Sequence, residues 1–139
     1  HPSGRRFDRD AVLGVECEIW IPAARPDIIR ADNVDQLRTR VVAQGANIPA
    51  TPEAELRLHE RGILSLPDFI ANAGGVICGA VEYAGGTKTQ AFQTIDERIR
   101  ANTAQVLERS ATTGQPPRVA ALELAESRVR QMMRYRRFT

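Results

Sequence analysis

The stretch that decides the fold runs from Val41 to Glu53 and reads VVAQGANIPATPE. It begins with a short β-branched run, which favours a strand, and continues into a turn at residues 45–47. Thr51 then predicts a helix start, because its side chain can accept a hydrogen bond from a free N–H of the first turn. Pro52 fits the first helical position, where its missing N–H would be unpaired anyway. A strand, a turn and a helix therefore follow one another closely.

Two more apolar runs flank this stretch and also favour strands. Residues 17–21 are closed by Pro22, and residues 62–66 are closed by Pro67. Strands that alternate with helices through short loops predict right-handed crossovers. We therefore expect an α/β fold with about three parallel strands and flanking helices.

The connections between these strands are expected to be helical. A short helix capped by Asp32 or Asn33 and ending near Arg40 is predicted between the first two strands. The helix that begins after Thr51 should end at Gly62 in a left-handed conformation. Both helices then act as crossovers between neighbouring strands.

The C-terminal part of the chain reads as three helices. Residues 68–83 are apolar around most of a helix, which predicts one helix buried on several sides. Breaks at residues 84–86 and 113–117 separate two further helices, one over about 89–110 and one ending near Tyr135. Each has an apolar stripe, so we expect an antiparallel helical hairpin packed on the rest.

Composition limits the class of protein. Hydrophobic residues make up 42% and charged residues 26%, which is typical of a soluble globular domain. No apolar run approaches the roughly 20 residues of a membrane helix, so we expect no membrane partner. Cys17 and Cys78 have neither disulfide-framework nor metal-ligand spacing. They predict reduced core cysteines, a cytoplasmic location and no metal site.

The charge and the termini add two expectations. A net charge of +2 is too small to indicate nucleic acid. The arginines of residues 128–137 suit a solvated helix end, and a phosphate-binding tail is the alternative. The chain opens with His1 rather than Met, so we expect a processed or cut chain with sequence missing upstream.

The strand ends are where chemistry is expected, because ligands of open parallel sheets bind beyond the carboxyl ends of the strands. These loops are residues 22–24, 45–47 and 68–75. Their small and amide-bearing side chains suit a carboxamide or a sugar hydroxyl, and they do not suit acid–base catalysis. As alternatives, Gly45 and Asn47 can simply form a turn, and Gly74 and Gly75 can allow a close helix crossing. His59 lacks a second His four residues on and reads as a surface residue.

Four strings in this order resemble the Glu/Leu/Phe/Val dehydrogenases: residues 16–24, 42–54, 59–64 and 67–76. The resemblance implies the second half of a Rossmann-type doubly wound domain, followed by the helical hairpin. It implies one partial NAD(P)-binding domain over residues 1–139, with a nucleotide-binding part at 1–86 and C-terminal helices at 87–139. It also implies oxidative deamination of an L-amino acid, such as glutamate, to a 2-oxo acid and ammonia, with NAD or NADP as cofactor.

The resemblance also implies cofactor-binding residues. Ala23 and Ala24 would lie beside the nicotinamide, and Asn47 would contact its ribose. The catalytic lysine and aspartate of the family belong to an N-terminal domain outside this chain, so no catalytic residue is expected here. Lys88 matches no catalytic motif.

Substrate-binding residues follow from the same resemblance. Asn72 would lie at the α-amino end of the substrate, and Val76 would line the pocket for its side chain. Glutamate-specific members usually carry a serine three residues after this valine, where this chain has Gly79. The amino acid used as substrate therefore stays open.

The leading hypothesis is a C-terminal cofactor-binding fragment of an amino-acid dehydrogenase, inactive alone. Its expected partners are the missing N-terminal substrate domain, a small amino acid and further copies of itself. One alternative is a stand-alone module that binds a nucleotide or a partner without catalysis. Another is a structural role in assembly, through the helical hairpin and an exposed sheet edge.

Overall fold

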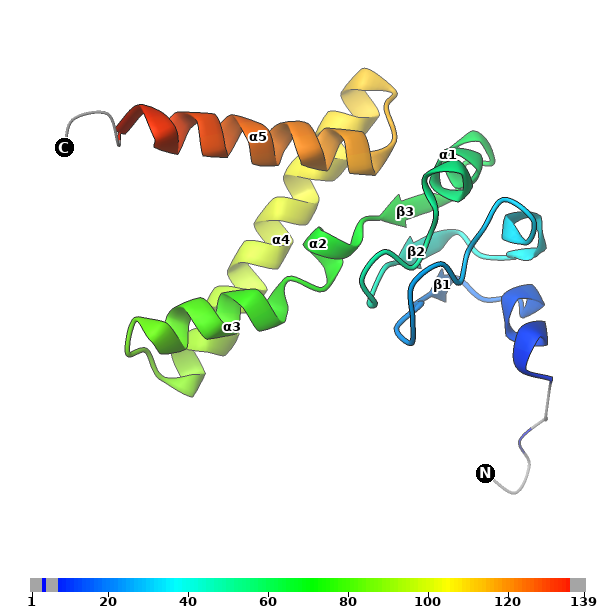
Figure 1. Ribbon diagram of the computed structural model, residues 1–139, viewed down its shortest axis with the longest axis horizontal. Helices are drawn as coiled ribbons and strands as arrows, with labels where there is room; N and C mark the ends of the chain where they lie inside the picture. Colours follow the sequence, from blue (N-terminus) through cyan, green and yellow to red (C-terminus); the bar gives the residue numbers. More distant parts are fainter. Residues whose placement is uncertain (1–3, 5–7, 136–139) are drawn as a thin grey trace.

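The computed structural model describes residue 4 and residues 8–135, which form a small sheet with a helical part beside it (Figure 1). The strands are β1 (Ile19–Trp20), β2 (Val41–Ala43) and β3 (Leu64–Leu66). They are parallel and lie in the order β1-β2-β3. Ile19 pairs with Val41, which pairs in turn with Leu64. The predicted three-stranded parallel sheet is confirmed, although β1 is shorter than the predicted run.

The connection between β1 and β2 differs from the prediction. It contains only a 3₁₀ turn, Val34–Gln36, because Leu37 adopts an extended conformation and places its side chain in the core. The Asn33 side chain makes no capping bond to this turn; its side-chain carbonyl accepts from the Arg30 N–H at 2.7 Å. The predicted helix that ends near Arg40 is therefore wrong.

Helix α1 (Pro52–Glu60) joins β2 to β3 as predicted. The Thr51 hydroxyl accepts a hydrogen bond from the Ala54 N–H at 3.3 Å, and Gly62 takes a left-handed φ of 70°. Ala54 and Leu58 pack into a core that includes Val42 of the sheet. The remaining members of this first core are Leu13, Ile29, Val34, Leu37, Ala50 and Ile63.

The predicted helix over residues 68–83 is two helices, α2 (Asp68–Ala71) and α3 (Gly74–Tyr83). The break falls at Asn72, whose backbone leaves the helical region and whose side chain bonds to a neighbouring loop. None of the residues of α3 is buried, so the prediction of a helix buried on several sides is wrong. Figure 1 shows why: α3 lies away from the sheet and packs along α4 (Lys88–Thr113).

Helices α4 and α5 (Pro117–Tyr135) form the predicted hairpin. Its antiparallel sense is shown by side-chain bonds from Arg109 to Glu123 and from Arg128 to Asn102. A second core joins the hairpin to β3 and α2. Its buried members are Ile70, Val106, Ala120 and Ala121, with Leu66, Phe69 and Leu124 packed against them.

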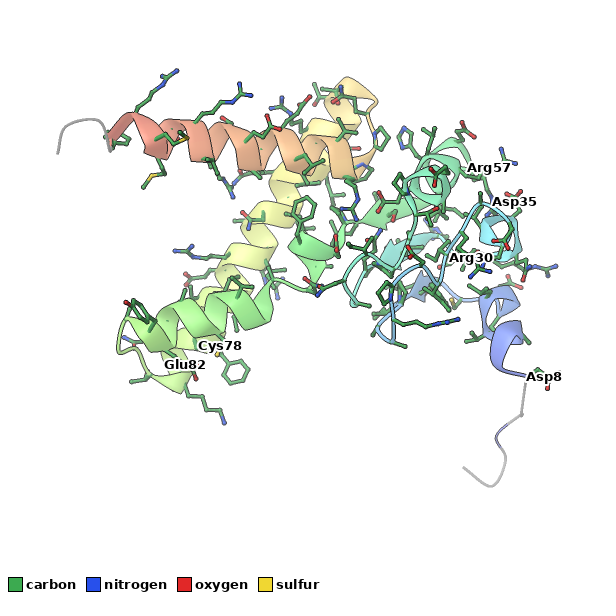
Figure 2. The ribbon with its side chains drawn as sticks, in the orientation of Figure 1. Asp8, Arg30, Asp35, Arg57, Cys78 and Glu82 are labelled. Carbon is green, nitrogen blue, oxygen red and sulfur yellow. The ribbon has the colours of Figure 1, made fainter. Side chains whose placement is uncertain are left out.

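Two further predictions from the sequence concern membrane-spanning helices and the two cysteines. Within residues 8–135 no helix is both long and apolar enough to cross a membrane. Cys17 and Cys78 are free thiols, but each is half-buried rather than part of a core. Cys78 lies with Glu82 on α3, far from the sheet (Figure 2), because α3 packs mainly along α4.

Candidate functional site

Three loops meet at the carboxyl ends of the strands. The Ala46 N–H donates to the Pro22 carbonyl at 2.8 Å, which joins the loops after β1 and β2. The Asn72 side-chain amide donates to Asn47 Oδ1 at 2.8 Å and to the Gly45 carbonyl at 3.4 Å. These bonds join the loop after β2 to the turn between α2 and α3, the short segment that follows β3. The predicted residues Ala23, Ala24, Asn47 and Asn72 therefore lie on one connected surface.

The first two loops approach closely because their side chains are small. A Cβ on Gly45 would lie 3.2 Å from Ala23 Cβ, which is tighter than ordinary van der Waals contact. A hollow of about 290 Å³ lies against the same loop. Its walls are mostly apolar and comprise Val12, Leu13, Trp20, Ile21, Pro22, Ala23, Ala24, Arg25 and Ile28. Small side chains and an apolar wall allow a planar ring to approach the backbone.

The Asn47–Asn72 pair supplies the polar groups of the surface. Asn47 is exposed and Asn72 is half-buried. Their shared bond uses one N–H of Asn72 and the carbonyl of Asn47. Among the described residues, the side-chain nitrogen of Asn47 and the side-chain carbonyl oxygen of Asn72 have no hydrogen-bond partner. The two N–H donors of the Asn47 side chain and the carbonyl acceptor of the Asn72 side chain are thus available to a neutral polar ligand.

The structure does not bring Val76 and Gly79 to this surface. Both lie on α3, where Val76 is 80% exposed and no atom lies within 4 Å of a Cβ built on Gly79. Spaced three residues apart, they share one face of the helix. That face is open in this chain.

A buried polar cluster behind the loops was missed by the sequence reasoning. It consists of Gln44, Glu55, Ser65 and Asp68, all buried, with Arg118 from α5 at its centre. Gln44 donates to Glu55 at 2.6 Å and to Ser65 at 3.1 Å. Arg118 donates to Glu55, to Gln44 at 3.0 Å and to Asp68 at 2.9 Å. The cluster ties the start of α5 to the sheet.

The charges of this cluster are stabilised by their partners. Burial by itself would raise the pKa of Asp68, but bonds from the Ile48 N–H and from Arg118 outweigh it and lower that pKa. Burial would lower the pKa of Arg118, yet hydrogen bonds and charge attraction from Glu55 and Asp68 raise it. The pair stays ionised near neutral pH. Asp68 is therefore a structural anion and is unsuited to proton transfer at that pH.

His59 lies away from the three loops. Its Nε2 is 3.1 Å from the Gly114 carbonyl, in the turn between α4 and α5. This contact gives the ring a structural partner and makes it half-buried rather than a free surface residue.

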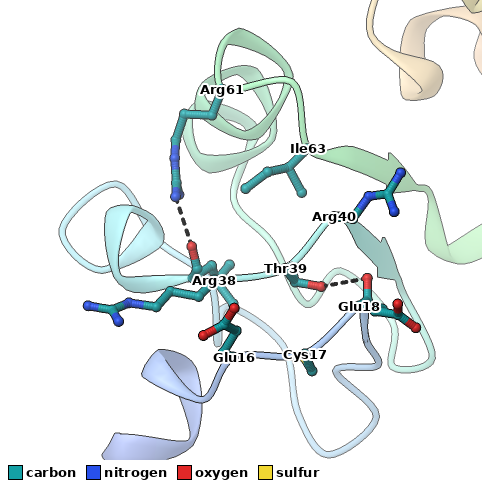
Figure 3. Close-up of a pocket in the computed structure, with 9 residues that line it drawn as sticks. Glu16, Cys17, Glu18, Arg38, Thr39, Arg40, Arg61 and Ile63 are labelled. Carbon is teal, nitrogen blue, oxygen red and sulfur yellow. Dashed lines mark hydrogen bonds between the residues drawn. The ribbon is translucent and has the colours of Figure 1, made fainter.

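A larger hollow of about 790 Å³ lies at the opposite, amino ends of the strands (Figure 3). Arg61 there donates to the backbone carbonyls of Val34 and Leu37, and the Thr39 hydroxyl donates to the backbone carbonyl of Glu18. These bonds connect segments of this same chain around the hollow. Within the described residues, no group of three or more His, Cys, Asp or Glu side chains is placed to hold a metal ion.

Comparison with known proteins adds sequence relatives. Leucine dehydrogenase of Bacillus subtilis is 37% identical over 134 residues, which cover 95% of this chain and 36% of that protein. The NADP(+)-dependent glutamate dehydrogenase of Pyrobaculum calidifontis is 49% identical over 76 residues, covering 55% of this chain and 18% of that protein. The chain thus spans only about a fifth to a third of the length of these relatives.

Solved structures share the fold. L-tryptophan dehydrogenase from Nostoc punctiforme matches 91% of this chain and 38% of its own, with a TM-score of 0.83 and 26% identity. The hetero-hexameric glutamate dehydrogenase from Thermus thermophilus matches 99% of this chain and 35% of its own, with a TM-score of 0.81 and 26% identity. The predicted α/β architecture with long C-terminal helices is thereby confirmed.

The family model described as Glutamate/Leucine/Phenylalanine/Valine dehydrogenase matches residues 2–137. This match covers nearly the whole chain and includes all three strand-end loops. The chain therefore belongs to the Glu/Leu/Phe/Val dehydrogenase family of amino-acid dehydrogenases.

Proposed function

We propose that this chain is the C-terminal cofactor-binding part of an NAD(P)-dependent amino-acid dehydrogenase. The reaction would convert an L-amino acid, such as glutamate, to a 2-oxo acid and ammonia. The observation that carries the proposal is the meeting of three strand-end loops at the Asn47–Asn72 amide pair. Such a surface, in a chain of this family, suits a nicotinamide nucleoside better than any group that needs a metal or a charged partner.

Each loop has a role in this proposal. Ala23 and Ala24 present little side chain and allow the nicotinamide ring to lie against the backbone. Asn47 offers its amide to the ribose, and Asn72 lies at the α-amino end of the substrate. The bound nucleotide supplies the hydride acceptor. Because hydride transfer needs the two reactants in contact, the 2.8 Å bond between Asn47 and Asn72 supports adjoining cofactor and substrate subsites.

The substrate side chain is assigned to the exposed face of α3. Val76 would line that pocket, and Gly79 takes the place of the serine typical of glutamate-specific members. We propose that the N-terminal substrate domain of the same protein covers this face. The identity of the amino acid, glutamate or another, depends on that domain as well as on Gly79.

An NMR titration of the chain with NAD⁺ and NADP⁺ tests the cofactor site. We expect shifts at Ala23, Ala24 and Asn47 with an affinity at millimolar levels, because half a site gives a small binding free energy. Asn47→Ala should remove the shifts, and Asn102→Ala, which changes an amide on α4 that bonds to Arg128, should leave them. Shifts confined to other residues would contradict the proposal. Micromolar binding would instead favour a stand-alone nucleotide-binding module.

An activity assay tests the role of the missing part. We expect no amino-acid-dependent reduction of NAD⁺ or NADP⁺ by this chain, since the described loops carry no base suited to neutral pH. Lys88 sits at the start of α4 beside Phe92, with its Nζ 5.8 Å from the ring centre. Reduction of NAD⁺ or NADP⁺ with any amino acid would contradict the proposal that the catalytic residues lie in the N-terminal domain.

Assembly and location complete the proposal. The hetero-hexameric glutamate dehydrogenase of Thermus thermophilus supports association of the whole protein into an oligomer. The free thiols of Cys17 and Cys78 support a reducing, cytoplasmic location.

A further inference from the structure

The loop that carries Asn47 has an unusual backbone. Ile48 has a φ of 48°, in the left-handed region that a β-branched residue rarely adopts. Such a conformation is strained and persists only where surrounding bonds hold it. One holding bond is the Ile48 N–H donating to Asp68 Oδ2 at 2.8 Å. The position next to Asn47 therefore depends on the Asp68 carboxylate.

Asp68 is in turn held by a residue of the last helix. It is buried, and its other oxygen accepts from Arg118 at 2.9 Å. The guanidinium also lies over the ring of Phe69, at 5.5 Å from its centre. The carboxylate thus bridges the Arg118 side chain and the Ile48 backbone.

Arg118 also reaches the other end of the same loop. Its Nη2 donates to Gln44 Oε1 at 3.0 Å, and Gln44 is the residue before Gly45. One guanidinium therefore touches the residue before the loop directly and the residue after Asn47 through Asp68. Glu55 of α1 accepts a further bond and fixes the direction of the guanidinium.

We propose that Arg118 is a positioning residue for the nucleotide site: it clamps both ends of the loop of residues 45–48 and so holds Asn47 against Asn72. The consequence for nucleotide affinity rests on the function proposed for Asn47. Through this clamp, α5, which is distant in sequence, controls a loop of the cofactor site.

A general docking role for α5 is separable from the clamp. Ala120 and Ala121 pack in the second core, and Glu123 pairs with Arg109 of α4 at 2.6 Å. These contacts leave α5 attached when the Arg118 guanidinium is removed. Arg109→Gln is the matched control, because it breaks an α5 ion pair that does not touch the loop.

Amide hydrogen exchange without ligand tests the clamp itself. In Arg118→Gln we expect the Ile48 N–H to exchange about tenfold faster, since the Asp68 carboxylate that accepts from it loses the charged donor that holds it. The NMR chemical shift of the Asn72 side-chain amide should change as well. Arg109→Gln should change neither. Arg118→Lys keeps the charge but not the planar donor geometry. It should therefore be thermally more stable than Arg118→Gln, while the Ile48 N–H still exchanges fast.

Unchanged exchange at Ile48 in Arg118→Gln overturns the proposal, as does an equal change in Arg109→Gln. If Arg118→Gln fails to fold, Asp68→Asn is the second variant. It keeps the side-chain volume, weakens the link to Arg118, and should also speed exchange at Ile48; unchanged exchange there overturns the proposal.

A titration of the same variants with NAD⁺ separates the two proposals. We expect the shifts at Asn47 to need about tenfold more NAD⁺ in Arg118→Gln than in the parent or in Arg109→Gln. Faster exchange at Ile48 in a chain whose parent form binds no nucleotide supports the clamp and contradicts the proposed function. Faster exchange with unchanged affinity contradicts control of the cofactor site by α5.

Discussion

At the scale of single residues, the site depends on two amides and one carboxylate. Asn47 and Asn72 are neutral and leave N–H donors and a carbonyl acceptor free for a ligand. Asp68 is charged, buried and fully engaged by Ile48 and Arg118. The amides are suited to contact a ligand, and the carboxylate is suited to hold the loop in place.

Replacing Asn72 by Ala should lower the free energy of unfolding by about 1 kcal/mol, because it removes the donor to the Asn47 loop at a half-buried position. Urea titration measures the change. Asn102→Ala removes one acceptor of Arg128, which keeps its bond to Gln105, so this variant should cost less. An equal loss of unfolding free energy in both variants would mean that the Asn47–Asn72 bond contributes no more than the Arg128–Asn102 bond.

Asp68 predicts a loss of stability in acid. Its pKa is lower in the folded chain than in the unfolded chain, where the ordinary value is about 3.9. The stabilisation is therefore present above the unfolded pKa and is lost as the pH falls through the folded pKa. In urea unfolding between pH 7 and pH 3, the free energy of unfolding should fall more steeply with falling pH for the parent than for Asp68→Asn. Parallel curves would contradict this assignment.

At the scale of elements, α1 is the best example of local control. Thr51 caps it, Pro52 begins it and Gly62 follows its end in a left-handed conformation. The helix then presents Ala54 and Leu58 to the sheet and Glu55 to the polar cluster. A correct start of α1 therefore matters to both the core and the site.

The variant Thr51→Ala should destabilise the chain by about 1 kcal/mol, since it leaves the Ala54 N–H without its capping oxygen. Thr51→Ser keeps the hydroxyl and is the matched control. Thermal or urea unfolding of both variants checks the expectation. A loss of the same size in Thr51→Ser would assign the effect to the lost methyl group instead of the cap.

At the scale of the whole molecule, one face of the sheet is incompletely covered. Val42 and Ser65, on one face, are buried, whereas the residues of β2 and β3 on the other face are only half-buried. Ile19 of the edge strand β1 is 58% exposed. An exposed strand edge with an apolar face is a template for pairing with another chain.

We therefore expect this chain to self-associate through β1, and Ile19→Lys should shift it towards monomer. Sedimentation velocity at high protein concentration measures the shift. Leu56→Lys, on the outer face of α1 and 53% exposed, is the matched control and should leave association unchanged. A monomeric parent chain would contradict the expectation.

The sequence by itself determined the parallel α/β class, the cap of α1 and the place of Asn47 and Asn72 at strand ends. These features depend on hydrogen bonds and periodicities within a few residues, so a local pattern is enough to predict them. The domain division at residue 86 and the roles of the site residues stay predictions.

Only the tertiary structure decided the break at Asn72, the exposure of α3 and the clamp of Arg118. An apolar pattern predicts a face that can be buried, but not whether a partner covers it, as Val76 shows. The break follows from a side-chain bond to a loop 27 residues away, and Arg118 meets Asp68 across 50 residues and Gln44 across 74. Pairings at such separations depend on the path of the whole chain, because only folding brings those side chains together.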